Sequence, residues 1–204
     1  KAVAEKRLWA TTNVAEAIAD TELSIVCVGT PSERNGSLDL RYIRNCCEEI
    51  GRALRNKSSW HNVTIRSTIL PGTMRNIIIP MLEESSGKKA GVDFGICNNP
   101  EFLREGTAVY DYRNPPKTVI GEIDSRSGDV LAGLYAHLQA PLIRTSVETA
   151  EMVKYVDNVW HAGKVAFANE IGNICKPLAI DSHEVMGIFC QDTKLNLSSY
   201  YLKP

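Results

Sequence analysis

The sequence has 204 residues, of which 44% are hydrophobic and 23% charged, and its formal net charge is −1 at pH 7. This is the composition of an ordinary globular protein, and the near-neutral balance gives no electrostatic basis for binding nucleic acid or an anionic membrane. No apolar run approaches the ~20 residues of a membrane span, and the first residues lack the apolar core of a secretory signal. The six cysteines form no CxxC pair. We therefore expect a cytoplasmic protein with reduced, mostly buried thiols and no metal site.

Short apolar runs alternate with helical patterns over the first 145 residues. Strands are expected at 24–28, 62–66, 92–97, 118–121 and 142–144, and helices at 14–19, from Asp39 to about Leu54, at 73–82 and at 129–138. Pro80 is expected to kink or end the third of these helices. Strands and helices that alternate at this spacing predict right-handed crossovers and a largely parallel sheet, which is an α/β fold.

The pattern changes after Arg144. Residues 146–176 predict one helix of roughly 45 Å, and its apolar stripe is too broad to be covered by a single partner. The stripe comprises Met152, Val156, Val159, Gly163, Phe167, Ile171 and Ile174. We expect this helix to link two domains or to form a subunit interface. A final helix follows Asp181 and Glu184, which have the spacing of a capping box.

Three of the predicted strands end in small polar residues and prolines. These ends are Gly29-Thr30-Pro31, Ser67-Thr68 and Asn98-Asn99-Pro100. Such residues are common in ordinary turns, but ligands of parallel sheets bind beyond the carboxyl ends of the strands. Three similar ends favour a shared ligand-binding rim.

The stretch 98–107 contains two carboxylates that merit attention. Pro100 suits the first position of a helix, so Glu101 and Glu105 are expected at i and i+4 on one side of a helical turn. By spacing alone they are solvated acids that favour the helix dipole. By base rates, Lys154 is likewise a solvated lysine paired with Glu151.

Several segments together resemble the UDP-glucose/GDP-mannose dehydrogenase family, over nearly the whole chain. They are Val28-Gly29-Thr30-Pro31, Arg66 to Thr73, Asn99 to Thr107, Ala150 to Tyr155 with Asn158, and Asn169 to Asn173. The tail from Leu195 to Tyr201 and the segment Val159-Trp160-His161-Ala162 resemble the GDP-mannose branch. The resemblance implies a partial Rossmann-like doubly wound parallel sheet followed by a long central helix.

The resemblance also implies how the chain is organised. Residues 1–145 are expected to be the later part of an NAD-binding domain without its G-x-G-x-x-G turn. Residues 146–204 are expected to be the central helix, a short helix and the lead-in to a catalytic-cysteine loop beyond Pro204. None of the six cysteines matches the family's nucleophile, so the chain is interpreted as an internal fragment that is inactive in isolation.

The family's reaction is an NAD-dependent four-electron oxidation of a nucleotide-sugar alcohol to a carboxylate, here GDP-mannose to GDP-mannuronate, through a cysteine thiohemiacetal and thioester. It requires a base, an oxyanion donor and a held thiol. By resemblance, Glu101 is the general base for thioester hydrolysis, Thr68 helps to place a water, and Lys154 and Asn158 hold the oxyanion.

Further binding roles follow from the same resemblance. Thr30, Thr68 and Glu105 are expected beside the NAD cofactor. Residues expected at the nucleotide sugar are Glu101, Phe102, Leu103, Arg104, Lys154 and Asn158, with Tyr200 and Tyr201 as weaker candidates. The product is expected to serve polysaccharide biosynthesis, of alginate for example, and the central helix is expected to form a homo-oligomer.

Two alternatives remain open at this point. In the first, the substrate of the whole protein is UDP-glucose instead of GDP-mannose. In the second, the chain is a non-catalytic assembly module built around its long helix.

Overall fold

The structure is a computed structural model that describes residues 1–200 and 202. The chain forms two compact units, residues 1–155 and residues 156–204. The first unit contains the elements α1 (Val14–Ala19), β1 (Leu23–Val26), α2 (Arg41–Arg55), β2 (Asn62–Ile65), a π-helical segment η1 (Met74–Ile78), α3 (Ile79–Ser86), β3 (Gly95–Asn98), α4 (Ala108–Arg113), β4 (Thr118–Glu122), α5 (Ser125–Tyr135), β5 (Leu142–Ser146) and the start of α6 (Val147–Cys175).

The five strands form one sheet in the order β1-β2-β3-β4-β5. β1, β2 and β3 are mutually parallel, with Ile65 opposite Val26 on one side and Asn98 on the other. β4 pairs with β3 in the antiparallel sense and with β5 in the parallel sense. The predicted α/β class is confirmed, and the sheet departs from the parallel arrangement only between β3 and β4.

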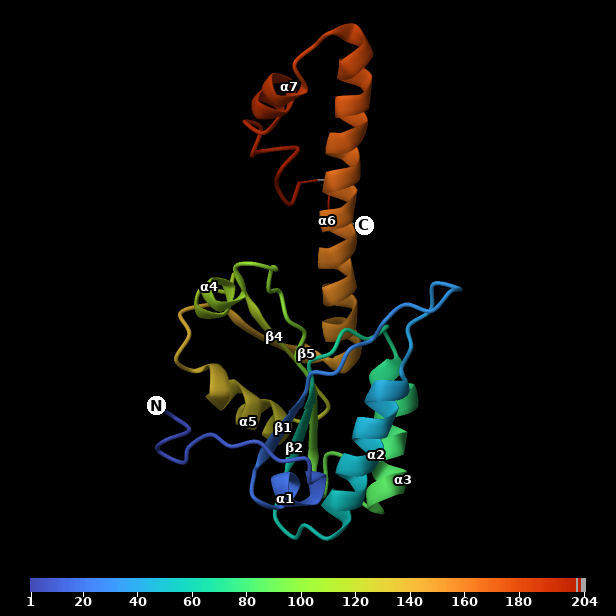
Figure 1. Ribbon diagram of the computed structural model, residues 1–204, viewed down its shortest axis with the longest axis vertical. Helices are drawn as coiled ribbons and strands as arrows, with labels where there is room; N and C mark the ends of the chain where they lie inside the picture. The colour runs from blue at the N-terminus through green and yellow to red at the C-terminus, as the bar shows by residue number, and fades with distance from the viewer. Residues whose placement is uncertain (201, 203–204) are drawn as a thin grey trace. The chain divides into compact units, whose positions relative to one another are not determined.

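Helices cover both faces of this sheet (Figure 1). α2 and α3 lie together on one side and α5 lies on the other. The spacing of Ile43, Cys47, Ile50 and Leu54 puts one apolar face of α2 toward the sheet, and all four are at most 5% exposed. β2 and β3 are buried at every position, as expected for the central strands of a two-faced sheet. This core fixes the strand ends that carry the candidate site.

Two helix predictions near the site are wrong in detail. No helix begins at Pro100, because the Glu101 carboxylate accepts a hydrogen bond from the Leu103 N–H at 2.7 Å and Gly106 has a left-handed φ of +81°. α4 instead begins at Ala108, so Glu101 and Glu105 do not share a helical turn. Of the two outcomes predicted for Pro80, the end of the helix is wrong, because Pro80 occupies the first turn of α3, directly after η1; the kink stays a prediction.

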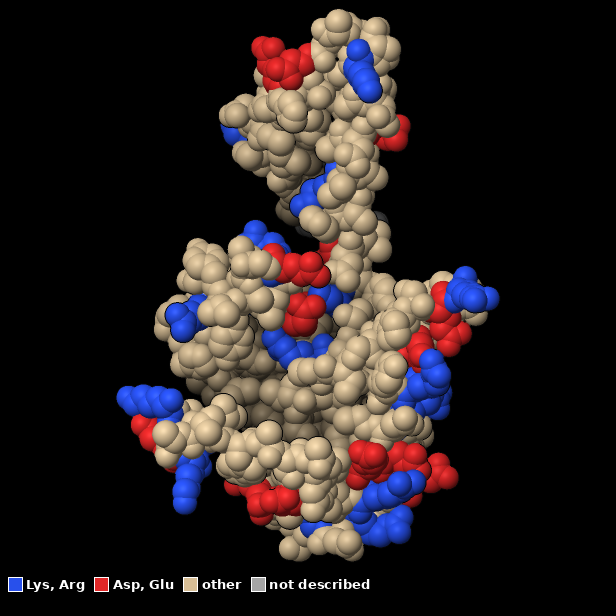
Figure 2. All heavy atoms as spheres, viewed as in Figure 1, with Lys and Arg blue, Asp and Glu red and all other residues tan. Residues whose placement is uncertain are grey.

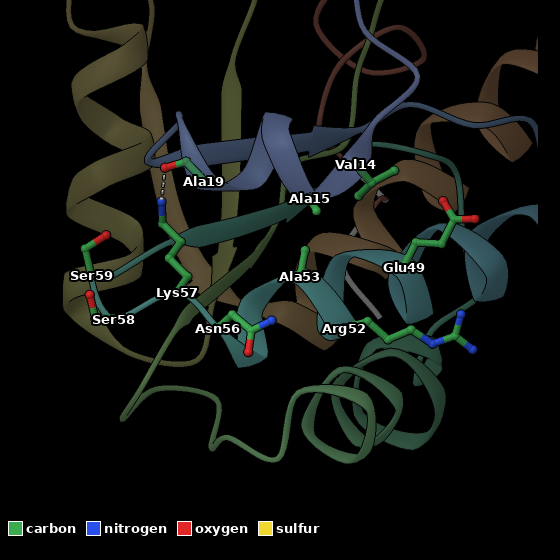
Figure 3. A pocket seen from close by; sticks show the side chains of 10 residues that line it. All are labelled: Val14, Ala15, Ala19, Glu49, Arg52, Ala53, Asn56, Lys57, Ser58 and Ser59. Atoms are coloured by element: carbon green, nitrogen blue, oxygen red, sulfur yellow. Dashed lines mark hydrogen bonds between the residues drawn. The ribbon is translucent and has the colours of Figure 1, made fainter.

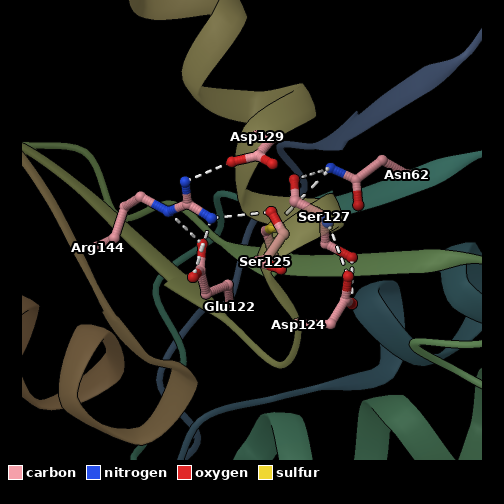
Figure 4. Close-up of polar contacts among 8 residues, drawn as sticks. Asn62, Glu122, Asp124, Ser125, Ser127, Asp129 and Arg144 are labelled. Atoms are coloured by element: carbon pink, nitrogen blue, oxygen red, sulfur yellow. Dashed lines mark hydrogen bonds and ion pairs between the residues drawn. The ribbon is translucent and has the colours of Figure 1, made fainter.

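An ionic cluster joins β4, β5 and α5 (Figure 4). The Arg144 guanidinium donates to both carboxylate oxygens of Glu122, at 2.8 and 3.1 Å, and to the Ser125 carbonyl at 2.8 Å. It also pairs with Asp129. These hydrogen bonds to two carboxylates raise the pKa of Arg144. Gly128 lies directly under the cluster, because a Cβ there would stand 1.5 Å from a Glu122 carboxylate oxygen.

We expect Gly128→Ala to destabilise the chain by a net of about 0.5–2 kcal/mol, because the usual overpacking cost of about 1–3 kcal/mol is partly offset by a helix-propensity gain of ~0.5–1 kcal/mol. The new methyl group would displace the Glu122 carboxylate and, with it, the Arg144 pairing. Gly133→Ala on the same helix is the matched control, since a Cβ there meets nothing within 4 Å. That control should gain ~0.5–1 kcal/mol from helix propensity. The urea concentrations at the unfolding midpoints of the two variants should therefore shift in opposite directions from that of the parent chain. Equal shifts would contradict the packing described here.

The second unit contains the remainder of α6, a 3-10 turn η2 (Lys176–Leu178) and α7 (Ser182–Phe189). The predicted N-cap of α7 is confirmed, because the Asp181 carboxylate accepts hydrogen bonds from the backbone N–H groups of His183 and Glu184; the return bond from the Asp181 N–H to Glu184, which would complete the capping box, stays a prediction. Phe167 on α6 and Phe189 on α7 contact each other with ring centroids 5.5 Å apart. Several apolar side chains of α6 remain exposed in this unit, among them Val156, Val159, Phe167 and Ile174 at 47–67%.

Acidic and basic side chains are mixed on the face shown in Figure 2. In the view of Figure 2, acidic and basic side chains alternate without a large area of either sign, in keeping with the net charge of −1. None of the helices within residues 1–200 is long and apolar enough to cross a membrane.

Candidate functional site

Two of the three predicted strand ends are bonded directly to each other. The Thr30 hydroxyl, beyond β1, donates to the Thr68 carbonyl beyond β2 at 2.9 Å. The Asn99 N–H, beyond β3, donates to the Ile65 carbonyl at 2.8 Å. The parallel register of β1, β2 and β3 therefore brings Thr30, Thr68 and Asn99 to one edge of the sheet, as the sequence predicts.

Glu101 and Lys154 meet at this edge. The Lys154 ammonium donates to the Glu101 carboxylate at 2.7 Å and to the Glu101 backbone carbonyl at 2.7 Å. The two side chains are 11% and 30% exposed, respectively, so the pair is largely removed from water. The Phe102 ring lies beside it, with its centroid 5.8 Å from the ammonium. The expectation from base rates, a solvated Lys154 paired with Glu151, is therefore wrong.

The electrostatics favour a charged carboxylate at Glu101. Burial on its own would raise the pKa of Glu101, but the hydrogen bonds from Lys154 and from the Leu103 N–H outweigh it, and the pKa is lowered. Glu101 is thus an ionised acceptor at neutral pH, in contact with one ammonium group. An acid and an ammonium held together in this way are able to act on one substrate oxygen and one water.

Asn99 organises the segment that leads into Glu101. Its side-chain oxygen accepts from the Arg66 guanidinium at 2.6 Å and from the Tyr135 hydroxyl at 2.5 Å, and its amide donates to the Val119 carbonyl at 2.8 Å. Asn99 is 1% exposed. We refer to Arg66, Asn99 and Tyr135 as the Asn99 cluster. It connects β2, β3, β4 and α5 immediately before Pro100.

A small cavity of about 30 Å³ adjoins the pair and the Asn99 cluster. A cavity needs about 10–15 Å³ on this measure to hold one water molecule, so there is room for one here. Its polar lining residues are Arg66, Asn99, Glu101, Asp111, Tyr112, Lys117, Thr118 and Tyr135. Because polar groups line the cavity on several sides, it is suited to hold an ordered water next to Glu101.

The remaining candidate residues are placed less centrally. Arg104 is bound through its guanidinium and its N–H to Asp111, whose pKa this pairing lowers. Phe102 and Leu103 are half-buried beside Glu101, whereas Glu105 is exposed. Asn158 and Tyr200 are exposed and belong to the second unit, and Tyr201 lies outside the described residues.

The predicted partner of Lys154 has a different function in the fold. Glu151 is 1% exposed, and its carboxylate accepts the backbone N–H groups of Gly72 at 2.7 Å and Met74 at 2.8 Å. Its pKa is raised by burial. Glu151 therefore binds the turn after Thr68 and not the lysine three residues along α6.

Another hollow, of about 520 Å³, lies between α1 and α2 (Figure 3). The Lys57 ammonium on its rim donates to the carbonyls of Ile18 and Ala19, at 2.8 and 2.9 Å. Lys57 thus satisfies the carboxyl end of α1, and we interpret this hollow as structural. Within the described part of the chain, no group of three or more His, Cys, Asp or Glu side chains is arranged to hold a metal ion.

The sheet, covered by helices on both faces and carrying polar residues at the carboxyl ends of its parallel strands, defines a Rossmann-like nucleotide-binding protein. Residues 1–139 match the UDP-glucose/GDP-mannose dehydrogenase family, NAD binding domain, and residues 148–204 match the central domain of that family. The chain belongs to the UDP-glucose/GDP-mannose dehydrogenase family.

Individual relatives agree with this assignment. The chain is 59% identical to a GDP-mannose 6-dehydrogenase of Pseudomonas aeruginosa over 97% of its length, and 39% identical to a UDP-glucose 6-dehydrogenase of Haloferax volcanii over 93%. It superposes on a crystal structure of a ternary complex of GDP-mannose dehydrogenase from Pseudomonas aeruginosa with a TM-score of 0.97 at 58% identity, covering 98% of this chain and 46% of that one. The chain spans about half the length of the relatives it matches, 45% of each of the two named here.

Proposed function

We propose that this chain carries the acid–ammonium part of the active site of an NAD-dependent dehydrogenase that oxidises GDP-mannose to GDP-mannuronate. The observation that carries the proposal is the Glu101–Lys154 contact at 2.7 Å at the carboxyl edge of the sheet. The identity of 58–60% to GDP-mannose 6-dehydrogenases, against 39% to a UDP-glucose 6-dehydrogenase, supports the choice of sugar nucleotide.

In this proposal the chain's own residues act on the oxygen and water chemistry of the reaction. Lys154 donates to the oxygen that develops negative charge, and Asn158 on the same helix assists it. Glu101 takes a proton from the water that attacks the thioester carbonyl, so that the C–S bond breaks and the carboxylate is released. Thr68 helps to position that water. The thiol of the thioester is not assigned within this chain, where burial raises the pKa of Cys47 and Cys97 to about 12.

The strand ends suit the cofactor that the family implies. When bound, NAD accepts the hydride from the substrate carbon in each of the two oxidations. A Cβ at Gly29 would meet nothing within 4 Å, so the backbone beyond β1 is open to a dinucleotide. Thr30 and Thr68 are the residues we assign to that ligand, with Glu105 beside it. We assign the sugar nucleotide to Phe102, Leu103 and Arg104, and more weakly to Tyr200.

We further propose that the chain divides near residue 145 into the later part of the NAD-binding domain, residues 1–145, and a central part, residues 146–204. The family matches at 1–139 and 148–204 support this boundary.

A second function, assembly, is supported by one observation. Val156, Val159, Phe167 and Ile174 on α6 expose 47–67% of their surface, and exposed apolar side chains in a row indicate a covering partner. We propose that a second copy of the chain packs there. Light scattering of the isolated chain should give a dimer or larger species, and a strictly monomeric chain at high concentration would contradict this part of the proposal.

The function itself is tested by turnover of the whole protein with NAD and either GDP-mannose or UDP-glucose, monitored by NADH absorbance. We expect two NADH per GDP-mannose and little reaction with UDP-glucose. A preference for UDP-glucose would change the substrate, and absence of NADH formation with both would favour the assembly role alone. The isolated 204-residue chain is the control and should give no sustained turnover.

A further inference from the structure

Glu151 is a buried carboxylate that the proposed chemistry does not use. It is 1% exposed, and its two oxygens accept the N–H groups of Gly72 and Met74 at 2.7 and 2.8 Å. These two N–H groups lie at the beginning of the η1 segment, where helical N–H groups lack partners within the helix. Charge-assisted hydrogen bonds of this kind are stronger than neutral ones. The contact therefore holds α6 firmly against the turn that follows β2.

The position of this contact along the chain gives it a consequence for the site. Gly72 follows Thr68 by four residues. Glu151 precedes Lys154 by three residues, so Glu151 and Lys154 lie on neighbouring turns of α6. The same helix thus makes two anchored contacts with the sheet edge, one through Glu151 to the β2 turn and one through Lys154 to Glu101. Because these two turns of α6 are adjacent, fixing the turn that carries Glu151 restricts movement of the turn that carries Lys154.

We propose that Glu151 is a positioning residue that sets the place of α6 so that the Lys154 ammonium reaches Glu101. The consequence for turnover rests on the proposed function, whereas the placement of Lys154 does not. Glu148, one turn earlier, offers a comparison. It pairs with Arg75 at 2.7 Å, but both side chains are about half exposed, at 41% and 52%. A salt bridge exposed to this extent contributes little.

The test is the rate at which Lys154 is acetylated by acetic anhydride, read by mass spectrometry on the folded 204-residue chain. Glu151→Gln should raise that rate about tenfold, which corresponds to ~1.4 kcal/mol of local opening. Lys57, bonded to the Ile18 and Ala19 carbonyls, reports on the fold away from α6 and should keep its rate. Glu148→Gln, which also removes one negative charge from α6, should leave Lys154 protected. An unchanged Lys154 rate in Glu151→Gln, with the Lys57 rate unchanged as well, would overturn the proposal.

A second pair of variants decides the matter if Glu151→Gln exposes Lys57 as well. Gly72 has φ +89°, and a Cβ there would stand 3.1 Å from the Asn76 amide, so Gly72→Ala strains the turn without touching α6. Gly87 has φ +69° with open space around it, which makes Gly87→Ala the matched control for a side chain at positive φ. We expect faster labelling of Lys154 only in Gly72→Ala, and equal rates in the two variants would refute the role of Glu151. Because labelling needs no turnover, a failure of the proposed dehydrogenase activity would not affect this result.

Discussion

Lys154→Met is expected to lower kcat of the whole dehydrogenase by about 10²- to 10³-fold, the usual cost of removing one oxyanion donor. The methionine side chain has a similar length and apolar stem but donates no hydrogen bond. It would leave the Glu101 carboxylate, 30% exposed, without its ammonium partner. Steady-state rates of NADH formation with saturating GDP-mannose measure the effect.

The matched control for this prediction is Lys164→Met on the same helix. Lys164 is exposed and lies 6.0 Å from the Trp160 ring, far along the sequence from the acid–ammonium pair. Its replacement should leave kcat within about twofold of the parent, as is usual for surface substitutions. Equal losses in both variants would mean that Lys154 contributes charge to α6 in general and no specific interaction at the site.

Asn99→Ala should have the largest effect on stability, a loss of about 3 kcal/mol or more. The substitution removes the partner of the Arg66 guanidinium, the Tyr135 hydroxyl and the Val119 carbonyl at once, and a buried polar group left without a partner costs about 1–3 kcal/mol. Urea unfolding of the 204-residue chain gives the value from the midpoint and slope.

Tyr135→Phe is the graded comparison, because it removes one hydroxyl, which donates to Asn99 and accepts from the Arg66 guanidinium at 3.0 Å, and leaves the Arg66–Asn99 and Asn99–Val119 hydrogen bonds in place. It should cost ~2 kcal/mol, because each of the two lost hydrogen bonds typically contributes about 1 kcal/mol net. If Asn99→Ala costs no more than Tyr135→Phe, the Asn99 cluster does not stabilise the strand ends as the distances indicate.

Periodicity was sufficient to predict most of the fold. The long helix predicted at 146–176 is α6, Val147–Cys175, because an apolar stripe at helical spacing continues without a break for that distance. β2 and β3 lie within the ranges expected for strands or within one residue of them, although both contain buried polar residues, Asn62 and Thr64 in β2 and Asn98 in β3. The antiparallel pairing of β4 with β3 was not predicted, because strand direction depends on the long connection between them and not on the strand residues.

For the candidate site, the contact between Glu101 and Lys154 was predicted, but the hydrogen bonds of the residues around it were not. The sequence resemblance brought Glu101 and Lys154 together, whereas their spacing alone favoured two unrelated solvated side chains. The roles of Asn99 and Asp111 were missed, because a hydrogen bond between residues distant in the sequence leaves no periodic pattern. The sequence signal for this pair is the position of Asp111, a carboxylate seven residues after Arg104 and close enough along the chain to pair with it.

Glu151 illustrates the same limit. At three residues from Lys154 it has the spacing of a helical ion pair, yet its carboxylate binds the N–H groups of Gly72 and Met74, 79 and 77 residues away in the sequence. Local spacing could not distinguish between these two partners. Only the packing of α6 against the turn after β2 decides between them.

The most direct test of the central claim, that Glu101 and Lys154 act as one unit, is a double-mutant cycle on kcat in the whole enzyme. Glu101→Gln alone should reduce kcat by about 10²- to 10⁴-fold, as expected for loss of a general base. If the two groups act together, the double variant Glu101→Gln/Lys154→Met should be about as slow as the slower single variant. A double variant whose loss equals the product of the two single losses would show that the residues act independently, and would contradict the account.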